Sequence, residues 1–146
     1  MEEKFYLTKR GLENIKKEYE ELKQIEFSET KKEFSQLLQS SNLDFLQTKI
    51  IELENILKNV ELIKKPSKQK RNIVNLGAGV TLKEKDGQNN EFIIVGELEA
   101  NPDEGKISFR SPVGKALLGR KVGDEIIVIC SKRTVYKIMK IKYDFM

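Results

Sequence analysis

Carboxylates are the side chains through which this sequence could do chemistry. Glu29 and Glu33 stand four residues apart, a spacing that places both on one face of a helix. Asp44 follows at the end of the same polar stretch. Carboxylate oxygens suit hard cations, so these three acids are the weak candidates for a site. The alternative is a solvated helix face on which Lys32 balances Glu33.

Other reactive side chains are scarce. Histidine is absent from the 146 residues, which removes the commonest general base and metal ligand. A single cysteine excludes an internal disulfide. No apolar run approaches the ~18 residues of a membrane span, and no signal peptide opens the chain. We therefore expect a cytoplasmic protein with no intrinsic metal site, no cofactor of its own and no membrane contact.

Two narrow apolar seams must position the acids. Nearly all other positions around them are charged or polar, which is typical of a coiled coil. The apolar residues recur at spacings of three and four: Leu12, Ile15, Tyr19 and Leu22 in the first seam, and Leu43, Leu46, Ile50, Leu53, Leu57 and Val60 in the second. We predict an antiparallel two-helix hairpin over residues 1–63 that leans on a second domain at its base.

The ends of this hairpin can be placed as well. Thr8 is a good N-cap, and Leu7 with Leu12 forms a hydrophobic staple around it. Matching the seams outward from the base sets Leu12 against Val60. Residues 27–42 then lie at the far end, where Phe34, Leu37 and Leu38 are expected to form a small packed cap.

A basic linker over residues 64–73 follows the hairpin. Pro66 cannot continue a helix. The positive side chains could contact nucleic-acid phosphates or simply be solvated. No aromatic residue stands among them to stack on a base. They are Lys64, Lys65, Lys68, Lys70 and Arg71.

The rest of the chain is predicted to form short strands joined by turns. Asp86-Gly87 predicts a hairpin between strands at 79–82 and 91–95, and residues 125–130 and 134–143 form another. This order of strands predicts a strongly bent antiparallel sheet wrapped on one short helix.

That helix has clear signals at both ends. Ser111 can cap it, Pro112 suits its first position, and Gly119 ends it in the left-handed conformation. Val122-Gly123-Asp124 then predicts a tight turn into the next strand. We assign residues 74–146 to this second domain.

The second domain resembles the C-terminal domain of the Gre-type bacterial transcription elongation factors, the GreA/GreB family. Lys9 and Gly11 also fit the start of the family's N-terminal arm. The resemblance covers roughly residues 74 to 142 and implies an α+β fold, with a coiled-coil hairpin and an FKBP-like domain. The motifs that carry it are Asp103-Glu104-Gly105-Lys106-Ile107-Ser108, the stretch from Ser111 to Gly119, and Val122-Gly123-Asp124.

The resemblance also implies a partner. Gre factors dock on bacterial RNA polymerase and insert the hairpin into its secondary channel. We therefore expect a monomer that acts on the polymerase active site without being an enzyme itself, and that meets nascent RNA or DNA only indirectly. By resemblance, the docking surface comprises Ser111, Pro112, Gly114, Lys115, Ala116, Leu117, Leu118 and Gly119.

The tip departs from the family. Gre factors carry an acidic tip whose carboxylates hold Mg²⁺ in the polymerase active site and drive cleavage of backtracked RNA. Here Asn42 stands where the family has Asp, Phe45 stands where it has Glu, and the second helix is about a dozen residues short by the family's pattern. An amide and a phenyl ring cannot replace two carboxylates around Mg²⁺. Cleavage therefore depends on Asp44, Glu29 or Glu33, or it is lost.

Three alternatives stay open. The first is a channel-binding modulator that competes with Gre factors and does not cleave. The second is a coiled-coil adaptor, which would explain residues 1–63 but not the later motifs. The third is a peptidyl-prolyl isomerase, because of the FKBP-like fold, although fold alone does not imply function. An isomerase needs an aromatic-lined pocket, and the rings at hand are Phe92, Phe109, Tyr136, Tyr143 and Phe145.

Overall fold

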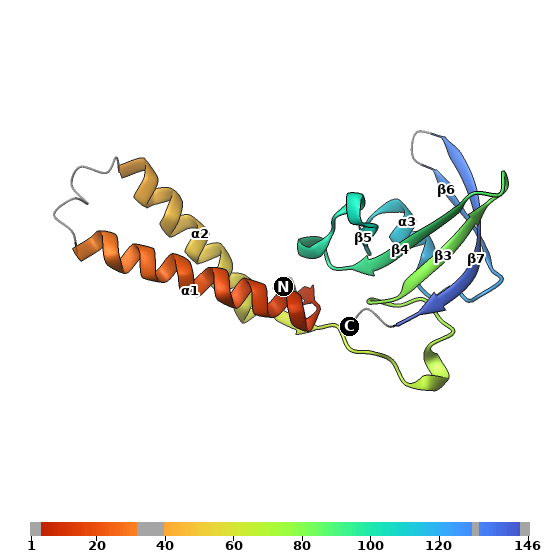
Figure 1. Ribbon diagram of the computed structural model, residues 1–146, viewed down its shortest axis with the longest axis horizontal. Coiled ribbons are helices and arrows are strands. Elements are labelled where there is room, and N and C mark those ends of the chain that lie inside the picture. Colours follow the sequence, from red (N-terminus) through yellow and green to blue (C-terminus); the bar gives the residue numbers. More distant parts are fainter. Residues whose placement is uncertain (1–3, 32–39, 130–131, 144–146) are drawn as a thin grey trace.

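The protein consists of a helical hairpin that projects from a domain built on a curled sheet (Figure 1). The computed structural model describes residues 4–31, 40–129 and 132–143, with the backbone alone for 28–31 and 40–43. This mixed α+β arrangement confirms the predicted fold class. No helix in these ranges is long and apolar enough to cross a membrane.

The hairpin consists of α1 (Lys9–Lys31) and α2 (Ser40–Lys58). Thr8 caps α1 as predicted, because its Oγ1 accepts a hydrogen bond from the Gly11 amide at 3.1 Å. The seam of α1 packs against two buried residues of α2, Leu53 and Ile56. The seam is narrow, as a coiled coil requires, and its residues in contact are Leu12, Ile15, Tyr19 and Leu22.

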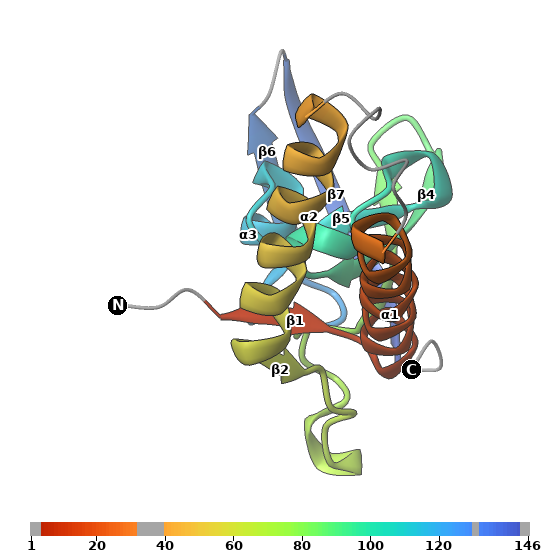
Figure 2. The ribbon, with the colours of Figure 1, turned by 90° about the vertical axis from the view of Figure 1, so that its left-hand side faces the viewer.

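The base of the hairpin differs from the prediction. Val60 lies outside α2, in the strand β2 (Val60–Leu62), and pairs in parallel with β1 (Phe5–Leu7). Figure 2 shows both strands beside the lowest turns of α2. Asn59 ends α2, since its side chain donates to the Asn55 carbonyl at 2.9 Å and its own carbonyl accepts from the Phe5 amide. The expectation that Val60 belongs to the helical seam is therefore wrong, although Val60 and Leu12 do pack against the same cluster.

The second domain is a five-stranded sheet with the order β5-β4-β3-β7-β6. Both predicted hairpins are present. The sheet is not wholly antiparallel, however, because β5 pairs in parallel with β4. The strands are β3 (Gly79–Glu84), β4 (Asn89–Val95), β5 (Lys106–Ser108), β6 (Glu125–Ile129) and β7 (Arg133–Lys142).

Two 3₁₀ turns make that parallel pairing possible. They are η3 (Glu97–Glu99) and η4 (Pro102–Glu104), and together they carry the chain from the end of β4 to the start of β5. The second of them is closed by Gly105, which has a φ of 76°.

The short helix α3 (Pro112–Leu117) plugs the curled sheet. Leu117 is fully buried in the core of the domain, beside residues from β3, β4, β6 and β7. Gly114 lies against β5 so closely that a Cβ there would come within 2.2 Å of the Ser108 carbonyl oxygen. A third 3₁₀ turn, η2 (Lys68–Lys70), lies in the basic linker.

Candidate functional site

The helix α3 is held in place by its caps. Ser111 Oγ accepts a hydrogen bond from the Gly114 amide at 3.1 Å and donates one to the Ser108 carbonyl at 2.7 Å. Gly119 has a φ of +81° and ends the helix in the left-handed region that favours glycine. The predicted capping at both ends is confirmed, so this surface has a fixed shape.

The eight residues of the predicted docking surface divide by burial. Gly114 and Leu117 are buried and hold α3 on the sheet, so neither can face a partner. Ser111, Ala116 and Leu118 are half-buried, whereas Pro112, Lys115 and Gly119 are exposed. The solvent-facing part of this predicted surface is therefore mainly one turn of α3 and its two ends.

The basic linker keeps most of its charges in solvent. Arg71 is half-buried, and its Nε donates a hydrogen bond to the Pro66 carbonyl at 3.1 Å. That bond holds the linker in a bend, and η2 lies within this bend. The exposed cations are Lys64, Lys65, Lys68 and Lys70.

Of the three candidate acids, only Asp44 has a described side chain. Asp44 is exposed in α2, and its neighbour Phe45 is 74% exposed. Glu29 lies in α1 and Asn42 in α2, but their side chains are outside the described residues. Glu33 and the expected cap of Phe34, Leu37 and Leu38 lie outside them entirely.

The donors described near the tip do not make up a Mg²⁺ site. Within the described ranges, no group of three metal-binding side chains is found. Asp44 offers one carboxylate in water, and the phenyl ring of Phe45 offers no donor. One exposed carboxylate is a poor site for a cation that keeps its waters unless several oxygens replace them.

The joint between the hairpin and the sheet domain holds residues that the sequence analysis missed. The Glu99 carboxylate accepts two hydrogen bonds from Thr8, at 2.6 Å from the backbone amide and 2.7 Å from the hydroxyl. The partners stand 91 residues apart. The one available signal was Gly11, a residue with poor helix propensity inside the first turn of α1.

Apolar and charged contacts continue the joint. Tyr6 meets Phe109 edge to face, with ring centroids 5.6 Å apart. Arg110 lies over the Phe109 ring and pairs with Glu97 of η3 at 3.4 Å. Gly96 is buried against β1, where a Cβ would lie 2.0 Å from the Tyr6 carbonyl oxygen. The base of the hairpin therefore leans on the second domain, as predicted.

Two tyrosines have perturbed acidity. The Tyr19 hydroxyl donates to Glu54 Oε1 at 2.9 Å, and this bond to a carboxylate raises the pKa of Tyr19 above 10.0. Burial raises the pKa of Tyr143, whose hydroxyl donates to the Ile73 carbonyl. Both hydroxyls therefore make hydrogen bonds within the fold.

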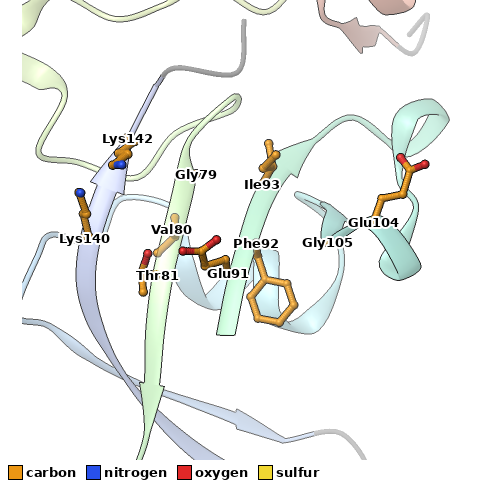
Figure 3. A pocket seen from close by; sticks show the side chains of 10 residues that line it. All are labelled: Gly79, Val80, Thr81, Glu91, Phe92, Ile93, Glu104, Gly105, Lys140 and Lys142. Atoms are coloured by element: carbon orange, nitrogen blue, oxygen red, sulfur yellow. The ribbon is translucent and has the colours of Figure 1, made fainter. Parts of the chain in front are cut away.

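A hollow of about 350 Å³ opens on the face of the sheet where Thr81, Glu91 and Lys140 stand side by side on β3, β4 and β7 (Figure 3). Its lining carries charges of both signs, including Glu104 and Lys142. It contains none of the predicted docking residues. Its chemistry does not indicate one class of ligand.

The aromatic residues do not line this hollow as an isomerase would need. Phe92 is the one described ring on its wall. Phe109 and Tyr136 pack half-buried against the core, Tyr143 is buried within it, and Phe145 lies outside the described residues.

Comparison with known proteins identifies the second domain. Residues 68–143 match the family model described as transcription elongation factor, GreA/GreB, C-term. The chain is 38% identical over 141 residues to transcription elongation factor GreA of Geobacillus kaustophilus, covering 87% of this chain and 89% of that protein. The crystal structure of GreA factor homolog 1 (Gfh1) of Thermus thermophilus is 27% identical, covers 96% of this chain and 99% of its own, and gives a TM-score of 0.46.

A second relative spans nearly the whole of both chains. Transcription elongation factor GreA of Clostridium acetobutylicum is 37% identical, covering 97% of this chain and 98% of that protein. The alignment runs over 156 positions, ten more than this chain has residues, so this chain lacks residues that its relative has. This chain belongs to the GreA/GreB family of transcription elongation factors.

Proposed function

We propose that this protein is an elongation regulator that binds bacterial RNA polymerase through its second domain and directs its hairpin into the secondary channel. The observation that carries the proposal is the family match over residues 68–143. The exposed turn at Pro112 and Lys115 supports docking there, because a capped and packed helix presents these residues without a conformational cost.

We further propose that the protein occupies the channel without stimulating RNA cleavage. Metal-assisted cleavage requires oxygen ligands that hold Mg²⁺ at the reacting phosphate. Of the three candidate acids, Asp44 is the one whose side chain is described, and by the resemblance Asn42 and Phe45 stand where the family has acids. Any Mg²⁺ at the reaction belongs to the polymerase, and a protein that fills the channel would compete with a cleaving Gre factor.

The basic linker has a place in the same proposal. Its exposed lysines lie beside the base of the hairpin, in the chain between β2 and the sheet domain. Phosphate contacts of this kind are sequence-independent and weaken as salt rises. We propose that Lys64, Lys65, Lys68 and Lys70, with Arg71 in a smaller role, contact nucleic acid in the elongation complex.

The experiment uses stalled, backtracked elongation complexes of the cognate polymerase with Mg²⁺. The protein is titrated alone and then against a cleaving Gre factor. We expect no cleavage above the intrinsic rate of the polymerase and a loss of Gre-stimulated cleavage. Lys115→Glu should weaken this competition, whereas the matched control Lys85→Glu, in the exposed β3–β4 turn, should not.

Two results would overturn parts of the proposal. Stimulated cleavage that Asp44→Ala abolishes would show that the chain is a cleaving factor. Failure to compete at any concentration, with no cleavage, would remove the polymerase as the partner and favour a coiled-coil adaptor.

A further inference from the structure

The first turn of α1 is capped from the other domain. In a capping box, a Glu or Gln at the third helical position reaches back to the amide of the N-cap residue. Here that position is Gly11, which has no side chain to do so. The Glu99 carboxylate takes its place and accepts the Thr8 amide at 2.6 Å.

The hydrogen bonds form a continuous chain across the joint. The Thr8 hydroxyl donates to Glu99 Oε2 at 2.7 Å and accepts from the Gly11 amide at 3.1 Å. Each of these bonds is directional. The bonds to a carboxylate are also stronger than those between neutral groups. The carboxylate thus ties the start of α1 to η3 in one orientation.

The Glu99 carboxylate occupies the space that a side chain at position 11 would need. A Cβ at Gly11 would lie 2.6 Å from both the Glu99 carboxyl carbon and its Oε1, and 2.9 Å from its Oε2. Gly11 does not adopt a positive φ, so conformational freedom does not explain it. The glycine leaves room for a side chain that arrives from the other domain.

We propose that Glu99 is the positioning residue that fixes the direction in which the hairpin projects from the sheet domain. Other contacts at the joint include the edge-to-face pair of Tyr6 with Phe109 and the close approach of Gly96 to β1. These contacts hold the base near the domain. The two hydrogen bonds to Glu99 act on α1 itself and fix its tilt. This inference deepens the proposed function, because a hairpin enters a channel only along the channel's axis.

The test measures the distance between two spin labels, one on each part of the molecule, without polymerase. The labels are attached at Glu20→Cys in α1 and Lys85→Cys in the β3–β4 turn, two exposed positions, after Cys130→Ser removes the native thiol. Glu99→Ala should broaden the distance distribution by about twofold, since it removes both directional bonds. Glu99→Gln keeps an oxygen acceptor and should restore most of the narrow distribution.

Gly11→Ala provides an independent test of the role of Glu99. Alanine is the better helix former and should stabilise α1 if Glu99 plays no part. We expect the opposite in the native background: the methyl group displaces the carboxylate and broadens the distribution. With Glu99→Ala already present, Gly11→Ala should cause no further broadening. Glu104→Ala, which removes the exposed ion pair of Glu104 with Lys106 at 3.5 Å, is the matched control and should change nothing.

Two outcomes would overturn the inference. One is a distribution in Glu99→Ala that matches the unsubstituted protein in position and width. The other is equal broadening in Glu104→Ala. Because the polymerase is absent, either outcome leaves the proposed function standing, and a failure of the polymerase assay leaves the role of Glu99 standing.

Discussion

The two parts of the molecule are stabilised in different ways. Among the described residues, the sheet domain buries one cluster of eleven residues around α3, whereas the hairpin buries a cluster of three, around Leu53. The domain therefore carries its own core. The hairpin depends on β1, β2 and the joint, because two helices with a narrow seam bury little apolar surface. A long arm can be built from few buried residues when its base is fixed to a domain that is already stable.

The largest expected effects come from the two cores. Leu117→Ala should lower the free energy of unfolding of the sheet domain by about 3 kcal/mol, because the side chain is fully buried. Leu53→Ala should lower the free energy of unfolding of the hairpin by a similar amount and leave that of the sheet domain unchanged. Hydrogen exchange followed region by region measures both. Loss of protection in β3 and β7 of Leu53→Ala would show that the two parts unfold together.

A smaller effect is expected at the joint. Gly96→Ala would force the Tyr6 carbonyl away from η3 and should cost about 2 kcal/mol of hairpin stability. Gly87 is the matched control, since a Cβ there meets nothing within 4 Å and its φ of +95° strains only the β3–β4 turn. Protection from hydrogen exchange should weaken in α1 and α2 of Gly96→Ala, but only near the β3–β4 turn of Gly87→Ala. The same pattern in both variants would contradict the assignment of Gly96 to the joint.

Glu97 tests whether Glu99 alone, rather than any acid of the η3 turn, positions the hairpin. It shares η3 with Glu99 but pairs with Arg110 on the surface, where both side chains are about half exposed. Glu97→Ala should therefore cost only about 0.5 kcal/mol, because exposed ion pairs are screened. Thermal unfolding measures the loss, and the spin-label distances should stay as they are. A broadened distribution would mean that the whole turn, rather than Glu99, positions the hairpin.

The smallest effect is a pH dependence in the hairpin. The Tyr19 hydroxyl donates to Glu54, so the folded state holds the phenol proton more tightly than the unfolded chain, whose tyrosine pKa is near 10.0. This contribution is fully present below pH 10.0 and is lost as the pH rises through the raised pKa. Tyr19→Phe removes this contribution. The free energies of unfolding of the variant and native helical hairpins should therefore converge as the solution becomes alkaline. A constant difference in thermal unfolding across that range would contradict this cause.

Local sequence signals were enough to predict much of the sheet domain. Ser111, Pro112 and Gly119 each act within one or two turns of the backbone, so the position and the ends of α3 could be predicted from the sequence. Asp86-Gly87 located the first hairpin for the same reason. The apolar seam predicted the contacts of α1 with α2, since its period is a property of the helix itself.

The joint could not be predicted because its signals are not local. Glu99 meets Thr8 across 91 residues, and nothing beside either residue marks the other. The strand at Val60 was missed because it continues the apolar spacing of the helix, and three residues are too few to show alternation. The parallel pairing of β5 depends on the path of η3 and η4, which spacing alone does not determine.

The hairpin can be viewed as a lever with its fulcrum at Thr8. The 23 residues of α1 extend about 34 Å from that point. A tilt of about 10° at the fulcrum would therefore displace the far end by about 6 Å, more than one full turn of helix. Two hydrogen bonds near the fulcrum thus determine the aim of the far end, and an error too small to unfold anything at the base would still misdirect the tip.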